Sequence, residues 1–76
     1  MLNTQTRQQV LINRIDNLEG IIASNLAMAN RCRERGETDR ADAYLENNEQ
    51  VKKIIAECRN ELTRIEQGQV AQVEQQ

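Results

Sequence analysis

Apolar residues recur at alternating spacings of four and three along two segments of the chain. The first series is Leu11, Ile15, Leu18, Ile22, Asn25, Ala29 and Cys32, and the second is Tyr44, Asn48, Val51, Ile55, Cys58, Leu62 and Ile65. This spacing places all members of a series on one face of a helix, as in a coiled coil. The pattern predicts two amphipathic helices, over about residues 5–35 and 38–67.

The residues between the two series predict a tight turn. Gly36 suits the left-handed position that ends a helix, and Thr38 suits the N-cap of the next one. Thr6 and Gln9 fit a capping box at the start of the first helix. Gly68 is expected to stop the second helix, which leaves 1–67 as one hairpin domain and 68–76 as a flexible, Gln-rich tail.

The two series also predict how the helices align. In an antiparallel hairpin folded at 36–37, facing residues have numbers that add up to 73, which places Leu11 opposite Leu62. The polar member of the first series, Asn25, then faces Asn48. Each amide satisfies part of the other's hydrogen bonding, so the pair would fix the register at some cost in stability. The alternatives are that the two positions coincide by chance or line a wet pocket.

Several large apolar residues lie outside both series, on the flanks of the predicted helices. Two helices cannot cover them, and soluble monomers avoid apolar patches of this kind. The hairpin is therefore expected to self-associate into a four-helix bundle or a higher oligomer. The flanking residues are Val10, Ile12, Ile21, Leu26, Met28, Leu45 and Ile54.

Gly20 lies inside the first predicted helix, on the side opposite its apolar series. Small residues share that side, and they would allow another helix to approach closely; they are Gly20, Ala23, Ser24 and Ala27. We expect them to belong to the oligomer interface as well. A helix break near Gly20, giving a three-helix bundle, is the alternative.

Composition strengthens the case for assembly. The chain has 76 residues, of which 38% are hydrophobic, and its one aromatic residue is Tyr44. So short a chain buries a thin core unless partner subunits add to it. No apolar run is long enough to span a membrane, and no signal-peptide pattern is present, so a cytoplasmic location with reduced thiols is expected.

Residues 36–44 resemble the turn between the helices of a tetratricopeptide repeat or of a microtubule-interacting-and-transport bundle. Both have a glycine, then an alanine and an aromatic residue at the positions of Gly36, Ala41 and Tyr44. The resemblance implies the turn and no peptide-binding role, because neither a second copy nor the closing proline of the repeat is present.

Few residues of the chain are candidates for catalysis. The sequence has no His, and Cys32 and Cys58 fall within the apolar series, where cysteine acts as a small hydrophobe. We therefore expect no enzymatic activity, no cofactor and no metal site.

One cluster carries possible binding chemistry, at the turn end of the hairpin. Arginine forks bind phosphates and carboxylates, a tyrosine can stack on a base, and a helix N-terminus binds anions. The candidate residues are Arg31, Arg33, Arg35, Thr38, Arg40 and Tyr44. Acidic neighbours and the helix dipole offer a purely structural interpretation of the same arginines.

These patterns favour a small, non-enzymatic, oligomeric module that binds a partner protein, in the style of regulatory and accessory proteins of phages and bacteria. The first alternative is an oligomer that holds a phosphate-bearing ligand, such as a nucleotide, at its arginine clusters. The second is an RNA-binding hairpin dimer, which the net charge of −2 disfavours. No membrane partner is expected.

Overall fold

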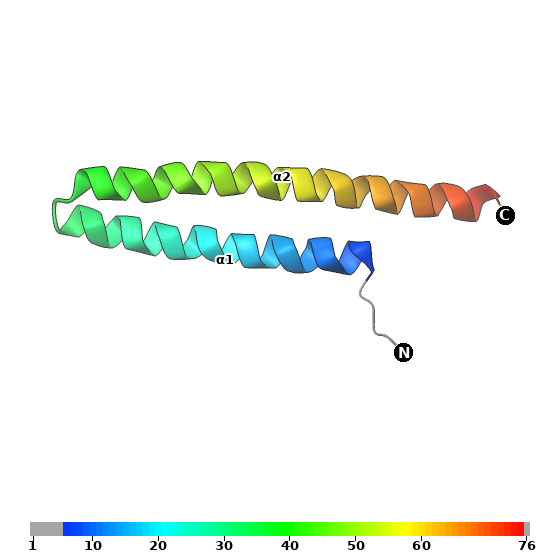
Figure 1. Cartoon of the computed structure of the whole chain (residues 1–76), viewed down its shortest axis with the longest axis horizontal. Coiled ribbons are helices and arrows are strands. Elements are labelled where there is room, and N and C mark those ends of the chain that lie inside the picture. The colour runs from blue at the N-terminus through cyan, green and yellow to red at the C-terminus, as the bar shows by residue number, and fades with distance from the viewer. Residues whose placement is uncertain (1–5, 76) are drawn as a thin grey trace.

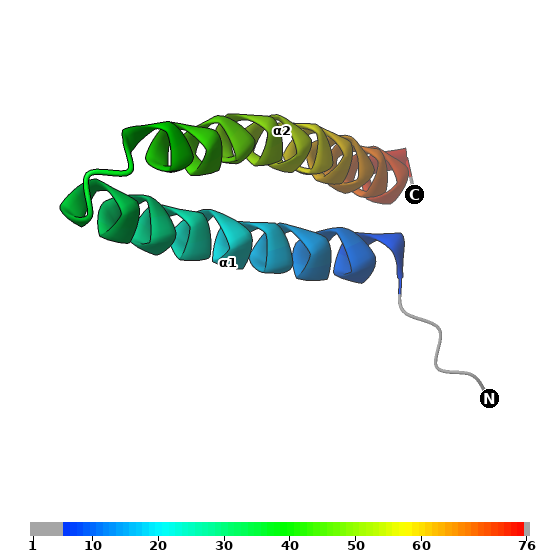
Figure 2. The ribbon, with the colours of Figure 1, turned by 60° about the vertical axis from the view of Figure 1, so that its left-hand side comes forward.

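The computed structural model describes residues 6–75, including the side chains of residues 6–68. Within this range the chain forms two helices, α1 (Arg7–Glu34) and α2 (Thr38–Gln75), which run antiparallel and side by side (Figure 1). The described residues of the two helices form a single layer, as the second view confirms (Figure 2). The all-α hairpin is confirmed, and no other part of the described range, residues 6–75, covers either broad face of the layer.

α1 is one unbroken helix. The Thr6 hydroxyl accepts a hydrogen bond from the Gln9 N–H at 3.1 Å, which caps its first turn; residue 5 lies outside the described residues. The helix continues through Gly20, so the predicted alternative of a break there is wrong. Glycine costs a helix interior about 1 kcal/mol relative to alanine. Packing against α2 on both sides of Gly20 outweighs that cost.

The turn provides hydrogen-bond partners for backbone N–H and carbonyl groups at the end of α1 and the start of α2. Gly36 has a φ of +77°, its N–H donates to the Arg33 carbonyl at 3.0 Å, and the Glu37 N–H donates to the Cys32 carbonyl at 2.8 Å. This is a Schellman motif. The Glu37 carbonyl accepts the first bond of α2, from the Ala41 N–H at 3.1 Å. Glu37 is therefore the N-cap, and the prediction for Thr38 is wrong by one residue.

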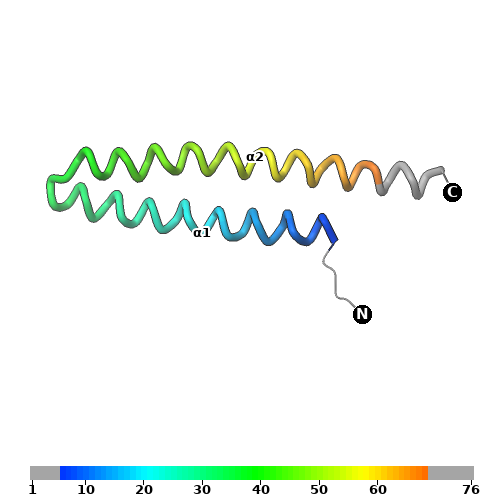
Figure 3. Tube along the Cα trace, in the orientation of Figure 1, coloured from blue at the N-terminus to red at the C-terminus, as the bar shows by residue number. Residues whose placement is uncertain are grey.

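α2 does not stop at Gly68, as the sequence had suggested, but continues to Gln75. One glycine weakens a helix without ending it, and no proline follows. The side chains of the predicted tail from residue 69 onward, and residue 76, lie outside the described residues. α2 therefore extends past the first residue of α1, as the trace in Figure 3 shows for the part up to Gly68.

The core consists of two clusters along the seam between the helices. The distal cluster, far from the turn, contains Leu11, Ile15, Val51, Ile55 and Cys58. The turn cluster contains Ala29, Cys32 and Ala41, with Tyr44 and Leu45 packed against it. Between them lies one polar layer, in which Asn25 Nδ2 donates to Asn48 Oδ1 at 2.9 Å. That contact joins the two residues that the register of 73 places face to face.

Candidate interaction surface

All four large hydrophobic residues that the described chain leaves exposed lie on α1. They are Val10, Ile12, Ile21 and Leu26, and Leu26 is the most accessible at 48%. The other flanking residues named from the sequence, Met28 on α1 and Leu45 and Ile54 on α2, are only partly exposed. Of these, Leu45 packs on the turn cluster and Ile54 on the distal cluster. α1 therefore has more uncovered apolar surface than one partner helix can bury.

The four exposed residues divide between the two broad faces of the hairpin. Ile12 and Leu26 stand seven residues on either side of Glu19, and seven residues bring a helix to within 20° of the same direction. The Glu19 carboxylate accepts a bond from the Arg59 guanidinium of α2 at 2.7 Å, which fixes these residues on one broad face. We call it the Glu19 face.

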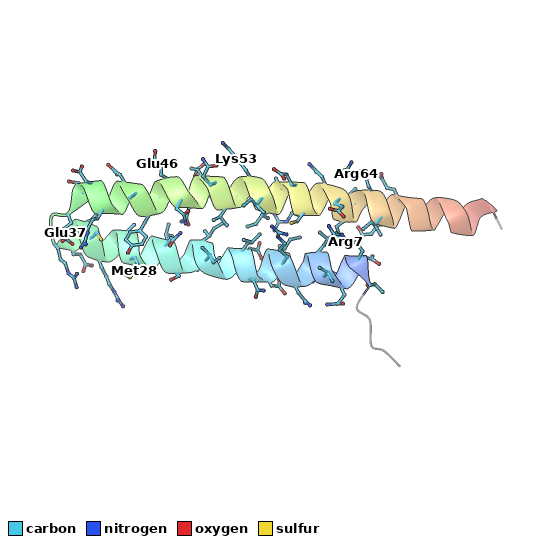
Figure 4. All side chains as sticks on the ribbon, viewed as in Figure 1. Arg7, Met28, Glu37, Glu46, Lys53 and Arg64 are labelled. Carbon is cyan, nitrogen blue, oxygen red and sulfur yellow. The ribbon has the colours of Figure 1, made fainter. Side chains whose placement is uncertain are left out.

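The opposite side, which we call the Arg7 face, holds Val10 and Ile21. There the Arg7 guanidinium donates to both carboxylate oxygens of Glu61, at 2.7 and 3.2 Å. This bidentate bond lowers the pKa of Glu61 below its ordinary value and raises that of Arg7. Figure 4 shows Arg7 near the start of α1, while Lys53 and Glu46 on α2 point away from α1.

The Glu19 face contains the larger hollow, an open groove of about 590 Å³ midway along the hairpin. Its apolar lining consists of Ile22, Ile55 and the exposed Ala56. Its rim is charged and carries Glu19, Lys52 and Arg59, with Asn60 beside them. The seam residues Ile22 and Ile55 therefore border the groove on this face. The sequence analysis did not assign Lys52 and Arg59 to an interaction surface. Both follow Leu45 at seven-residue intervals, and this repeat could have placed them on the same helix face.

The small residues predicted for the interface lie elsewhere. Gly20, Ala23, Ser24 and Ala27 are all exposed. A Cβ placed on Gly20 would meet no atom within 4 Å. Within the described hairpin, these residues have no helix against them.

The predicted arginine cluster does not converge on one point. Arg31 and Arg33 are two residues apart, so they leave α1 about 200° apart around its axis. Arg35 is the C-cap of α1, and Thr38 is the exposed first residue of α2. Arg40 lies 3.5 Å from the Glu37 carboxylate, an i,i+3 ion pair. Glu37 Oε1 is buried and has no hydrogen-bond partner.

Two residues of that cluster do line a common hollow. An open space of about 460 Å³ near the turn is bordered by Arg40 and Tyr44, together with Ala43, Asn25 and Asn47. Asn25 and Asn47 were not predicted to belong to a ligand site. Arg31, Arg33, Arg35 and Thr38 lie outside this hollow.

The two thiols are separate and buried, Cys32 in the turn cluster and Cys58 in the distal cluster. Among the described residues, no three His, Cys, Asp or Glu side chains gather closely enough to hold a metal ion. No helix in that part of the chain is long and apolar enough to cross a membrane.

Compared with protein-family models, with curated proteins and with solved structures, the chain matches none of them. The functional argument therefore depends on the surface chemistry of the hairpin itself.

Proposed function

We propose that this protein is a non-enzymatic interaction module that works as an assembly of identical hairpins. The observation that carries the proposal is the exposure of Val10, Ile12, Ile21 and Leu26 on one helix. Residues 6–75 form two helices and no third element that could cover them. Large exposed apolar patches are typical of protein-binding surfaces. The assembled form would then present its outer, charged surface to further protein partners.

Sedimentation velocity over a range of concentrations tests this proposal. We expect the wild-type chain to sediment as a species of at least twice its 8.8 kDa mass. Changing the four exposed hydrophobic residues to Gln should give a folded monomer. A matched control, Lys53→Gln with Asp16→Asn, changes exposed residues that belong to none of the predicted interface positions and should leave the assembly intact. A wild-type chain that stays monomeric at all concentrations would contradict the proposal.

A second candidate function is favoured by the hollow beside Arg40 and Tyr44. A guanidinium and a phenol ring on one hollow suit an anionic ligand with an aromatic ring, such as a nucleotide. If this candidate is right, a nucleotide panel should raise the melting temperature of wild type, following mass action. Arg40→Ala should abolish the shift, whereas Arg31→Ala, outside the hollow, should retain it. An equal shift in Arg40→Ala would rule the hollow out.

A further inference from the structure

The Glu19 face carries two straight lines of residues with a seven-residue repeat. On α1 the line is Ile12, Glu19 and Leu26, and on α2 it is Leu45, Lys52 and Arg59. The ion pair between Glu19 and Arg59, and the groove that both border with Lys52, place the two lines on the same face. Each line combines apolar and charged positions, as helices in a bundle do where they meet a second neighbour.

The line on α1 of one copy matches the line on α2 of a second copy, apolar residue to apolar residue and negative charge to positive charge. If α1 of one copy lies antiparallel to α2 of the other, three facing pairs have numbers that add up to 71. Leu26 then meets Leu45, Glu19 meets Lys52, and Ile12 lies along the aliphatic part of Arg59. An apolar pair, an ion pair and a mixed pair thus occur at one constant register, two helical turns apart.

From this match we propose that a second copy of the chain covers the Glu19 face, related by a two-fold axis parallel to the helices. The axis places α1 of each copy on α2 of the other, so every neighbouring pair of helices in the four-helix bundle is antiparallel. The seam residues Ile22 and Ile55, which line the groove, then lie at the centre of the bundle. This interface deepens the proposed function and rests on it.

Charge decides between this axis and the other two-fold arrangement of the same faces. An axis across the helices would lay α1 on α1 and α2 on α2. It would then place Glu19 opposite Glu19 of the second copy, and Lys52 opposite Lys52. Like charges facing each other at an interface weaken it, whereas the axis along the helices pairs opposite charges at both places.

The area of the face is sufficient for a stable dimer. α1 has 28 residues, which gives a length of about 42 Å, and two helices side by side are about 20 Å wide. The face therefore offers roughly 800 Å² per partner, which is the area that standard protein interfaces bury on each side. Nearly all of the paired length of the hairpin has to take part to reach it.

The Arg7 face serves as the matched control. It also carries exposed apolar residues, Val10 and Ile21. Its hollow near the distal cluster is smaller, about 140 Å³, and is bordered mainly by charged residues: Arg7, Arg14, Glu57 and Glu61. The hollow of about 460 Å³ beside Tyr44 lies on this side too, because its residue Asn47 stands two seven-residue intervals before Glu61. If the second copy sits on the Glu19 face, charge changes on the Arg7 face should leave the dimer unaffected.

A charge-exchange experiment tests the interface. Glu19→Lys alone places Lys against Lys52 of the other copy, and Lys52→Glu alone places Glu against Glu19. Each single variant should dimerise at least tenfold more weakly than wild type in sedimentation equilibrium. An equimolar mixture of the two should form a heterodimer, because both of its Glu–Lys contacts are then of opposite charge. The double variant Glu19→Lys/Lys52→Glu should dimerise like wild type.

The outcomes separate this proposal from the broader one. If wild type dimerises and the single variants do so equally well, the interface is elsewhere and only the present inference fails. The same follows if Arg14→Glu, on the Arg7 face, separates the dimer. Circular dichroism of each variant distinguishes loss of assembly from loss of helix. The double variant controls for the two broken intrachain bonds, from Arg59 to Glu19 and from Lys52 to Glu49. A monomeric wild type would overturn the proposed function itself.

Discussion

The distal cluster and the turn cluster solve the same packing problem with different side chains. Leu11, Ile15 and Ile55 fill the space between the helices far from the turn, whereas Ala29 and Ala41 are buried near it. Ala41 has 0% exposure, and so small a side chain can be covered only where the opposite helix lies very close. The connection at Arg35–Glu37 is short, which fixes that closeness. Large buried side chains therefore stabilise the distal end of the hairpin, whereas the close approach of the two helices stabilises the turn end.

The largest expected effect comes from removing bulk in the distal cluster. Leu11→Ala deletes a side chain that is 2% exposed and leaves a cavity, which costs about 2–5 kcal/mol in the free energy of unfolding. Urea denaturation followed by circular dichroism measures it. Val10→Ala, at the exposed neighbouring position, should cost far less. Equal losses in the two variants would show that the distal cluster is not the main source of stability.

The next effect comes from adding bulk to the turn cluster. Ala41→Leu forces the helices apart where they are closest, which should cost about 1–3 kcal/mol by overpacking. Ala43→Leu, two residues away and exposed, should be nearly neutral in the same denaturation assay. If Ala41→Leu is neutral or stabilising, closeness of the helices is not what buries the turn cluster.

The boundary between the clusters is tested by a double-mutant cycle on the asparagine pair. Asn48 is 3% exposed and also donates to the Ile22 carbonyl at 3.2 Å. Changing either residue alone to Leu leaves the other amide without its partner, which should cost about 1–3 kcal/mol. The double change should be less costly than either single one and should loosen the register. Additive effects would mean that the two amides are not energetically coupled.

Replacing Gly20 or Gly36 by Ala should change the free energy of unfolding by about 1 kcal/mol, in opposite directions. Gly20→Ala should stabilise α1 by about that amount, because the new methyl group meets no atom within 4 Å. Gly36→Ala should destabilise the turn by about 1 kcal/mol, because a φ of +77° disfavours a Cβ. Thermal melts of both variants measure the difference. A stable Gly36→Ala would indicate that the turn end tolerates another backbone conformation.

The smallest effect belongs to the ion pair that closes the distal end. The bond from Arg7 lowers the pKa of Glu61 below its ordinary value of 4.5. The contribution of this ion pair to the stability of the fold is therefore present at neutral pH. It is lost as the pH falls below 4.5 and through the lowered pKa. Glu61→Gln should therefore flatten the acid limb of the stability curve slightly, and high salt should weaken the wild-type effect. Glu57→Gln, on the same helix, is the control and should flatten it less.

The sequence alone determined the two helices, their antiparallel seam and the pairing of Asn25 with Asn48. Each follows from periodicity, and a single polar residue in each apolar series fits only one register. The sequence also determined the turn, because Gly36 can adopt a left-handed backbone conformation without strain. These features depend on neighbours along the chain or on one repeating spacing.

Only the tertiary structure decided the rest. Gly20 and Gly68 look like helix breaks, but both lie inside helices. Packing against α2 keeps α1 intact at Gly20, and α2 continues past Gly68 because one glycine without a following proline does not end a helix. The arginines near the turn look like one cluster, and their directions around two helices separate them. The groove between Glu19 and Arg59 exists because two residues 40 positions apart meet across the seam. Composition and spacing place residues on a helix, but only the packed pair of helices shows which of their faces remains uncovered.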